Sequence, residues 1–231
     1  MPDIIPIITA FAGGTFPALA WLWFWRREDS KHPEPRRLIA LAFFAGMVTV
    51  AIVIPVQKLI QPFFVNAAMM FTAWSGIEEL MKYLVARVTV LRRRDDDEPI
   101  DTVIYMVTVA LGFAAAENAL FLLSPLSGST FLETILTGNL RFVGATLLHV
   151  LSSAVIGAAL GLSFYKTERL KRIYALFGVI LAVILHSSFN FLILNTPEEH
   201  LLRTFGYVWI GLVALLAVLE YIKRIHPLWK T

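Results

Sequence analysis

The sequence contains no cysteine, few charged residues and neither of the hydrolase motifs HExxH and GxSxG. Without cysteine there is no disulfide framework, thiol nucleophile or thiolate zinc site, so any metal would need histidine or carboxylate ligands. The low charged fraction of 16% excludes an ordinary soluble domain, because 58% of the 231 residues are hydrophobic. The mean hydropathy of +0.70 agrees with this. The composition predicts an integral membrane protein.

The basic residues do not indicate nucleic-acid binding, although the net charge is +3 and the isoelectric point is near 9.3. They are confined to short segments between apolar runs, which is typical of loops on the inner side of a membrane. We therefore expect the lipid bilayer, and no nucleic acid, among the partners. The expected location is the cell membrane, with the chain crossing it several times.

Seven apolar runs predict an all-α, polytopic membrane helix bundle. The basic segments between them fall on one side, so the positive-inside rule places the N-terminus outside and the C-terminus inside. The first run lacks the features of a cleaved signal peptide, and without repeats or a soluble boundary residues 1–231 are expected to form one domain. The predicted spans are about 4–25, 38–60, 63–90, 100–123, 140–164, 173–194 and 204–221, with loops at about 57–62, 124–138, 165–172 and 197–203.

The third predicted span carries charged residues near its middle, in the stretch WSGIEELMK. A charged side chain at the centre of a membrane helix costs about 2.5–3.5 kcal/mol if it faces lipid, so these residues should face protein or water. On a helix, Lys82 lies three residues from Glu79 and four from Glu78. Lys82 can therefore neutralise one carboxylate and leave the other without a partner on its own helix.

Polar residues stand at one depth in four of the predicted spans. A lone intramembrane histidine or asparagine often makes only an interhelical hydrogen bond, whereas an acid usually marks a site or a pathway. The agreement in depth favours a shared polar cavity, while the other three histidines fall in loops or the tail. The residues of the cavity are Glu78, Glu79 and Lys82 on the third span, Glu117 on the fourth, His149 on the fifth, and His186 and Asn190 on the sixth.

Such a cavity suits the activation of water, and two schemes fit the same residues. In the first, a carboxylate takes a proton from water while a histidine polarises a carbonyl or holds the oxyanion. In the second, His149, His186 and Glu117 bind a catalytic zinc that keeps one position open for water. The sequence leaves both schemes open, and it does not show whether Glu78 or Glu79 is the base.

Four ordered motifs resemble those of the PrsW family of intramembrane proteases. That family is similar in turn to the group of CAAX prenyl endopeptidases and bacteriocin-processing proteins. The resemblance covers about residues 71–194, and it departs from the CAAX group in having glutamate where that group has the histidine of FxxxH. The motifs are EELMK at Glu78 to Lys82, FAAAE at Phe113 to Glu117, LLHVLSSAVIGAALG with His149, and HSSFN at His186 to Asn190.

The resemblance implies an integral-membrane endopeptidase that cleaves a membrane-anchored protein, such as an anti-sigma factor in regulated proteolysis. It implies Glu78 and Glu79 as the catalytic pair, supported by Glu117, His149 and His186. Two other classes stay open at this point. A proton-coupled transporter or channel could relay protons along the same residues, although no repeat is visible and the polar residues keep to one depth. A catalytically silent membrane scaffold is the third reading.

Overall fold

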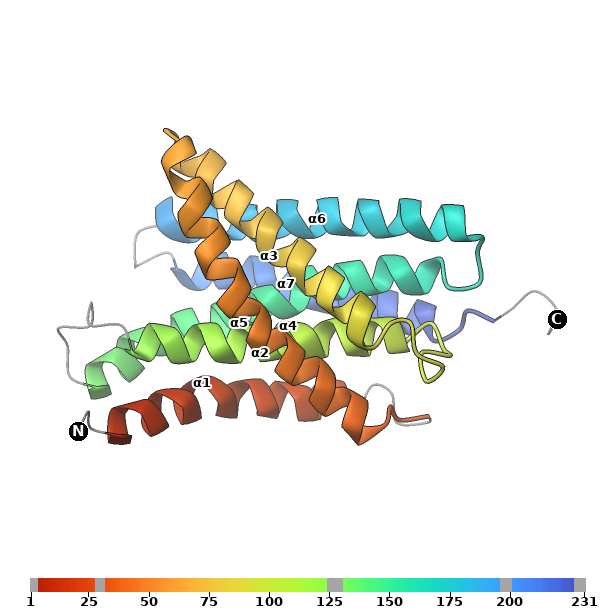
Figure 1. Cartoon of the computed structure of the whole chain (residues 1–231), viewed down its shortest axis with the longest axis horizontal. Helices are drawn as coiled ribbons and strands as arrows, with labels where there is room; N and C mark the ends of the chain where they lie inside the picture. The colour runs from red at the N-terminus through yellow and green to blue at the C-terminus, as the bar shows by residue number, and fades with distance from the viewer. Residues whose placement is uncertain (1–3, 28–31, 124–130, 196–200, 227–231) are drawn as a thin grey trace.

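The computed structural model describes residues 4–27, 32–123, 131–195 and 201–226, and this part of the chain contains only helices. The all-α prediction is therefore confirmed. Helix α4 lies in the interior and packs against α1, α2, α3 and α5 (Figure 1). The helices are α1 (Ile4–Trp25), α2 (Arg36–Ile60), a short 3-10 helix η1 (Gln61–Phe63), α3 (Ala67–Thr89), α4 (Asp101–Leu123), α5 (Phe131–Leu162), α6 (Glu168–Asn195) and α7 (Leu201–Ile222).

Helices α2 and α4 approach each other so closely that only glycine fits at their crossing. A Cβ atom at Gly112 would lie 1.9 Å from the backbone oxygen of Phe43, and one at Gly46 would lie 2.1 Å from that of Val109. Small residues allow membrane helices to pack backbone against backbone in this way. The crossing holds α2 against α4, and α3 packs on both of these helices.

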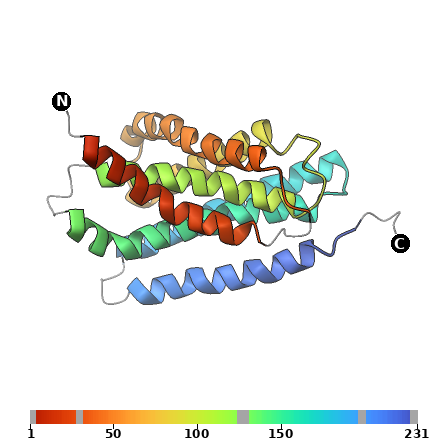
Figure 2. The same ribbon diagram turned by 90° about the horizontal axis from the view of Figure 1, so that it is seen from below.

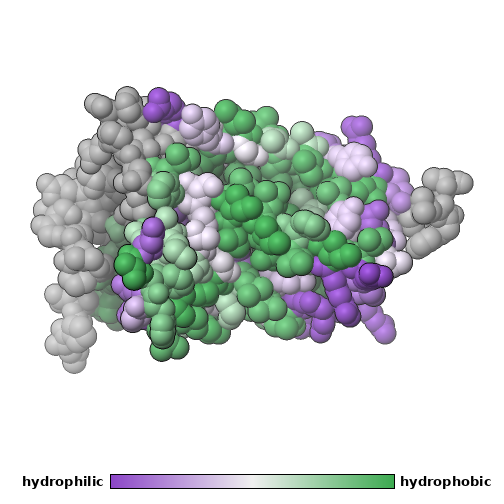
Figure 3. All heavy atoms as spheres, turned by 90° about the horizontal axis from the view of Figure 1, so that it is seen from above, coloured by the Kyte–Doolittle hydropathy of each residue, from purple (hydrophilic) through white to green (hydrophobic). Residues whose placement is uncertain are grey.

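The outer surface is suited to lipid. Hydrophobic side chains cover the middle of the bundle, and hydrophilic ones gather most densely at one end (Figure 3). Among the described residues, five helices are long and apolar enough to cross a membrane, and Gly206–Ile222 of α7 is a shorter apolar segment. Helix α3 carries the charged stretch described above and does not meet that criterion. The number of long apolar helices is that of a multi-pass membrane protein. The orientation, with the N-terminus outside and the C-terminus inside, stays a prediction.

The hydrophilic end is formed by the α3–α4 connection, the end of α5 and the start of α6, and we call it the basic end. Two of the predicted inner loops meet there, because His32 is paired with Glu98. The hydroxyl of Tyr105 also donates a hydrogen bond to Glu34, so the α1–α2 connection is tied to α4. The described chain ends emerge at opposite ends of the bundle, as an odd number of crossings requires (Figures 1 and 2).

Several predicted loop boundaries were wrong. Helix α5 begins at Phe131 and α6 at Glu168, so much of the expected loops at 124–138 and 165–172 is helical. Polar and charged residues such as Glu, Lys and Arg are good helix formers, so a helix continues beyond the hydrocarbon region that hydropathy detects. Gln57 lies within α2 and not in a turn. The remainders of the expected loops at 124–130 and 197–200 lie outside the described residues.

Candidate active site

The predicted polar residues lie together between α3, α4, α5 and α6. Glu78, Glu79, Lys82, His149 and His186 are all buried, and each lies within hydrogen-bond or ion-pair distance of another member or of Glu117. Helices α3 and α6 pack side by side, as do α4 and α5, which brings residues far apart in the sequence into one cluster (Figure 1). The polar side chains expected to share one depth therefore do meet in the structure, and we call these six residues the acid–histidine cluster.

Glu79 is the fully bonded carboxylate of the cluster. Its side chain is 0% exposed, and its Oε1 accepts hydrogen bonds from Lys82 Nζ at 2.6 Å and His186 Nδ1 at 2.7 Å. Ser152 Oγ donates to Oε1 at 2.8 Å, and Ser153 Oγ donates to Oε2 at 3.0 Å. Four donors on one carboxylate hold it rigidly and leave it little capacity to accept a further proton. Lys82 thus neutralises Glu79, as its spacing allowed.

Glu78 has one bonded oxygen and one unbonded oxygen. Gln57 Nε2 on α2 donates to Oε1 at 2.7 Å, which fixes the carboxylate from the side opposite α6. Oε2 is buried and has no hydrogen-bond partner among the described residues. The nearest basic atom is His186 Nε2 at 3.6 Å, which is beyond hydrogen-bond distance. An unbonded, buried carboxylate oxygen is costly and indicates a position for a ligand.

The two histidines are held by different carboxylates. His186 Nδ1 bonds to Glu79, which directs its Nε2 toward Glu78. His149 Nε2 bonds to Glu117 Oε2 at 2.7 Å, and Lys82 Nζ lies 3.2 Å from His149 Nδ1. The two imidazole rings meet edge to face with their centroids 5.0 Å apart. Glu117 is the accessible member of this group, because 44% of its side chain is exposed.

Asn190 lies one helical turn beyond His186, and its Nδ2 donates to Ser75 Oγ at 3.4 Å. It therefore braces α6 against α3 near the cluster, and its assignment as a site residue stays a prediction. Gln57 is the contact that the sequence reasoning missed. It stands near the end of an apolar run, where its polarity was interpreted as the start of a turn, and only helix packing reveals that it contacts Glu78.

The donor set fits a metal ion. Glu78, His149 and His186 each offer one ligand atom, and these three atoms lie within 4.8 Å of one another. Ligands on a zinc ion with bonds of about 2 Å lie about 3.3 Å apart, so side-chain rotations would have to bring the three atoms closer. His149 would also have to release Glu117 or Lys82 to bind the ion. The unbonded Oε2 of Glu78 is one of the available atoms. The Glu79–His186 bond matches the usual support of a metal-binding histidine, whose other nitrogen bonds to a carboxylate.

Comparison with known proteins agrees with this geometry. Residues 34–219 match the model of a family described as PrsW family intramembrane metalloprotease. The chain belongs to this family. It is a protease of the membrane, and the family description agrees with the Glu–His–His group found in the structure. Membership decides in favour of the protease over the transporter and the scaffold.

Curated relatives named Protease PrsW cover nearly all of the chain. The protein of Bacillus subtilis (strain 168) is 24% identical over 203 residues, which are 86% of this chain and 89% of the relative. That of Geobacillus kaustophilus (strain HTA426) is 26% identical over 191 residues, or 81% of each chain. The Oceanobacillus iheyensis protein is 27% identical over 212 residues, or 90% of this chain and 94% of the relative. No solved structure matches this PrsW-family chain significantly.

Proposed function

We propose that this PrsW-family protease is an endopeptidase of the cell membrane that cleaves a membrane-anchored protein, such as an anti-sigma factor, by attack of water on the peptide bond. The observation that carries the proposal is the unbonded Oε2 of Glu78, buried 3.6 Å from His186 Nε2. A site at membrane depth suits a substrate whose scissile bond lies within or next to the bilayer. A soluble peptide would not reach it easily.

We assign the metal to Glu78, His149 and His186, and not to the set of His149, His186 and Glu117 expected from the sequence. When bound, a metal there would lower the pKa of water and polarise the substrate carbonyl. Glu117 accepts the hydrogen bond of His149 Nε2 and is much more exposed than Glu78 and Glu79. Because Glu117 lies at the accessible side of the cluster, it is better placed to transfer a proton than to act as a buried metal ligand.

In our proposal Glu117 takes the proton from the attacking water, in place of Glu78 or Glu79, which were expected from the sequence to be the base. The side chain of Glu117 is 44% exposed whereas that of Glu79 is fully buried, so of these two carboxylates only Glu117 is accessible from outside the cluster, as a general base must be. Glu117 can then return the proton to the leaving amine. Glu79 acts as a positioning residue, because its bond to His186 Nδ1 leaves Nε2 of that ring free to bind.

The charges of the cluster support a divalent cation. Three carboxylates and the ammonium of Lys82 leave two negative charges when both histidines are neutral. One divalent ion would balance them, and uncompensated charge is costly in the interior of a membrane protein. The charge of Lys82 is compatible with a metal ion nearby, because Lys82 neutralises Glu79, which binds no metal in this assignment.

Metal content and cleavage, measured on the same preparations, test these roles. We expect Glu78→Gln and His186→Ala to lose both the metal and the cleavage of a co-expressed, tagged anti-sigma factor. Glu117→Gln should keep the metal and lose about 10²- to 10⁴-fold in rate. The control is Glu220→Gln, which removes an exposed carboxylate at the end of α7. Full activity in Glu117→Gln, or normal metal content in Glu78→Gln, would contradict the assignment.

A further inference from the structure

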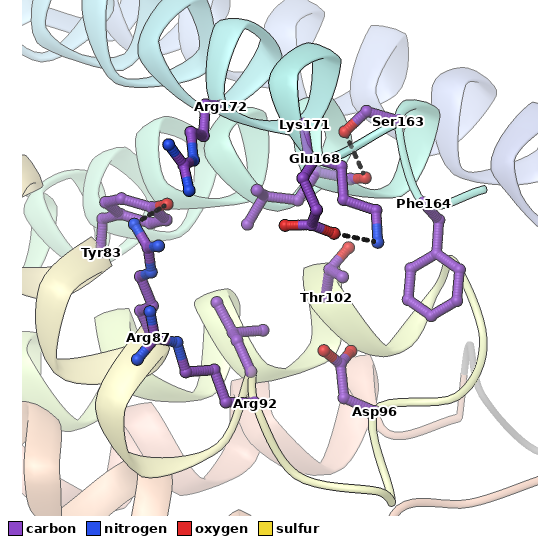
Figure 4. A pocket seen from close by; sticks show the side chains of 12 residues that line it. Tyr83, Arg87, Arg92, Asp96, Thr102, Ser163, Phe164, Glu168, Lys171 and Arg172 are labelled. Carbon is purple, nitrogen blue, oxygen red and sulfur yellow. Dashed lines mark hydrogen bonds and ion pairs between the residues drawn. The ribbon is translucent and has the colours of Figure 1, made fainter. Parts of the chain in front are cut away.

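A cavity lies at the basic end, away from the acid–histidine cluster. Its volume is about 330 Å³, and it is enclosed by the end of α3, the α3–α4 connection, the end of α5 and the start of α6 (Figure 4). None of its lining residues belongs to the cluster. Arg87 follows Glu78 by nine residues on α3, which is about 13 Å along the helix axis.

Cations predominate on the walls of this cavity. Arg87, Arg92, Lys171 and Arg172 line it together with two acids, and Lys171 is paired with one of these, Glu168, at 3.3 Å. Within the described ranges, the three arginines form no ion pair, although Arg87 Nη1 donates to the hydroxyl of Tyr83 at 3.4 Å. Figure 4 shows Arg87 and Arg172 on one side of the cavity and Lys171 on the other. Guanidinium groups bind phosphate oxygens through paired hydrogen bonds.

The second acid, Asp96, does not oppose an anion at neutral pH. Its Oδ1 is buried and has no hydrogen-bond partner among the described residues. Burial, and secondarily the charge of Asp101, raise the pKa of Asp96 to about 8, although Lys171 acts in the opposite direction. At pH 7 this carboxyl is mostly protonated and can donate a hydrogen bond to an anion. The walls then carry four positive charges and only the negative charge of Glu168.

Apolar stripes lead from the two arginines toward the middle of the bundle. On α3, Leu84 and Leu80 precede Arg87 by three and seven residues and are 40% and 45% exposed. On α6, Leu176 and Ile180 follow Arg172 by four and eight residues and are 60% and 46% exposed. Residues at these spacings share a helix face, so each stripe continues the face that bears its arginine. Acyl chains can lie along both stripes while a headgroup occupies the cavity.

We propose that this cavity binds a phosphate group, and that the group is carried by an anionic phospholipid of the leaflet at the basic end. The unpaired arginines supply the charge, the unbonded Asp96 oxygen supplies a polar contact, and the apolar stripes favour a lipid over free phosphate. A bound phosphate group would connect the end of α3 to the start of α6. Further along these helices lie the cluster residues Glu78 and Glu79 on α3 and His186 on α6. The site is independent of the proposed catalytic roles.

Lipid retention by the purified full-length protein tests this proposal. The protein is equilibrated with mixed phosphatidylglycerol and phosphatidylcholine, and the retained lipid is identified by native mass spectrometry. We expect retained phosphatidylglycerol, with at least about tenfold weaker retention in the double variant Arg87→Gln, Arg172→Gln. The control is Arg94→Gln, Arg169→Gln, which removes two exposed arginines that do not line the cavity, one in the α3–α4 connection and one on α6.

A second measurement and a second variant distinguish a lipid from free phosphate as the ligand, and a loss of binding from a loss of folding. Protection against thermal unfolding by inorganic phosphate in detergent, lost in the cavity variant, would support the phosphate site. The same protection without any retained phosphatidylglycerol would identify free phosphate as its ligand and overturn the assignment to a lipid. If the double variant does not fold, Arg92→Gln changes a single exposed loop residue of the same cavity. Equal retention of phosphatidylglycerol by the wild type and the cavity variants, or equal loss in the control, would overturn the proposal.

Discussion

Replacing Lys82 with methionine would remove the ammonium group that lies 2.6 Å from the fully buried Glu79. Methionine fills much of the same volume, so the change removes the charge, together with the contact of Lys82 Nζ with His149 Nδ1, and leaves little empty space. Three neutral donors would stay on Glu79, namely His186 and the hydroxyls of Ser152 and Ser153. They offset part of the loss, but breaking a buried pair by removing one partner typically costs about 3–5 kcal/mol. We expect a loss of that size in the free energy of unfolding.

A second substitution shows whether the uncompensated charge causes the loss. In the double variant with Glu79→Gln, the carboxylate that Lys82 neutralised is removed as well, so about 1–3 kcal/mol of the stability should return. Unfolding of the purified protein in mixed detergent micelles measures all four species of the cycle. A Lys82→Met protein as stable as the wild type, or a double variant no more stable than the single one, would refute the pairing argument.

Three further predictions concern other parts of the molecule. Gln57→Ala should weaken metal binding about 10- to 100-fold by releasing Glu78, as measured by metal titration; unchanged affinity would count against this contact. Gly112→Ala should destabilise the bundle by about 1–3 kcal/mol, because its Cβ would lie 1.9 Å from a backbone oxygen of α2. Gly206→Ala, with nothing within 4 Å, is the unfolding control. Phosphatidylglycerol retention should fall as the pH rises through about 8, because Asp96 then becomes negatively charged. The charged groups around it are Asp97, Asp101, Glu168, Arg92 and Lys171. The variant Asp96→Asn should show no such fall in retention.

The sequence was sufficient for the helices and for the membership of the cluster. The apolar runs located all seven α-helices of the described residues, because crossing the lipid requires about twenty mostly apolar residues. Helix α3 was found despite its charged stretch, and the short helix η1 was not predicted. The depth of Glu117, His149 and His186 within their spans showed that they could meet, because a charged or polar group at that depth must find a partner. The starts of α5 and α6 were placed too late, because hydropathy reports the hydrocarbon thickness and not the end of helical hydrogen bonding.

The roles within the cluster depend on contacts between helices that no local pattern encodes. Gln57 contacts Glu78 across the α2–α3 interface, and α2 is also held close to α4 at Gly46 and Gly112. The sequence gives no register for either contact. Likewise, the exposed fraction of the Glu117 side chain depends on which side chains of the neighbouring helices cover it. These are properties of packing, and they decide which carboxylate is accessible from outside the cluster.

The adjacent glutamates illustrate why the sequence alone could not separate them. Both lie within one turn of Lys82, so spacing along the helix gives each the same opportunity to pair with it. Neighbouring residues on a helix point about 100° apart, however, so the two carboxylates enter different interfaces. Glu79 faces the serines of α5 and His186 of α6, whereas Glu78 faces Gln57 of α2 and keeps one oxygen unbonded. The pair is therefore not redundant: one glutamate holds the histidine in place, and the other leaves an oxygen free for the chemistry.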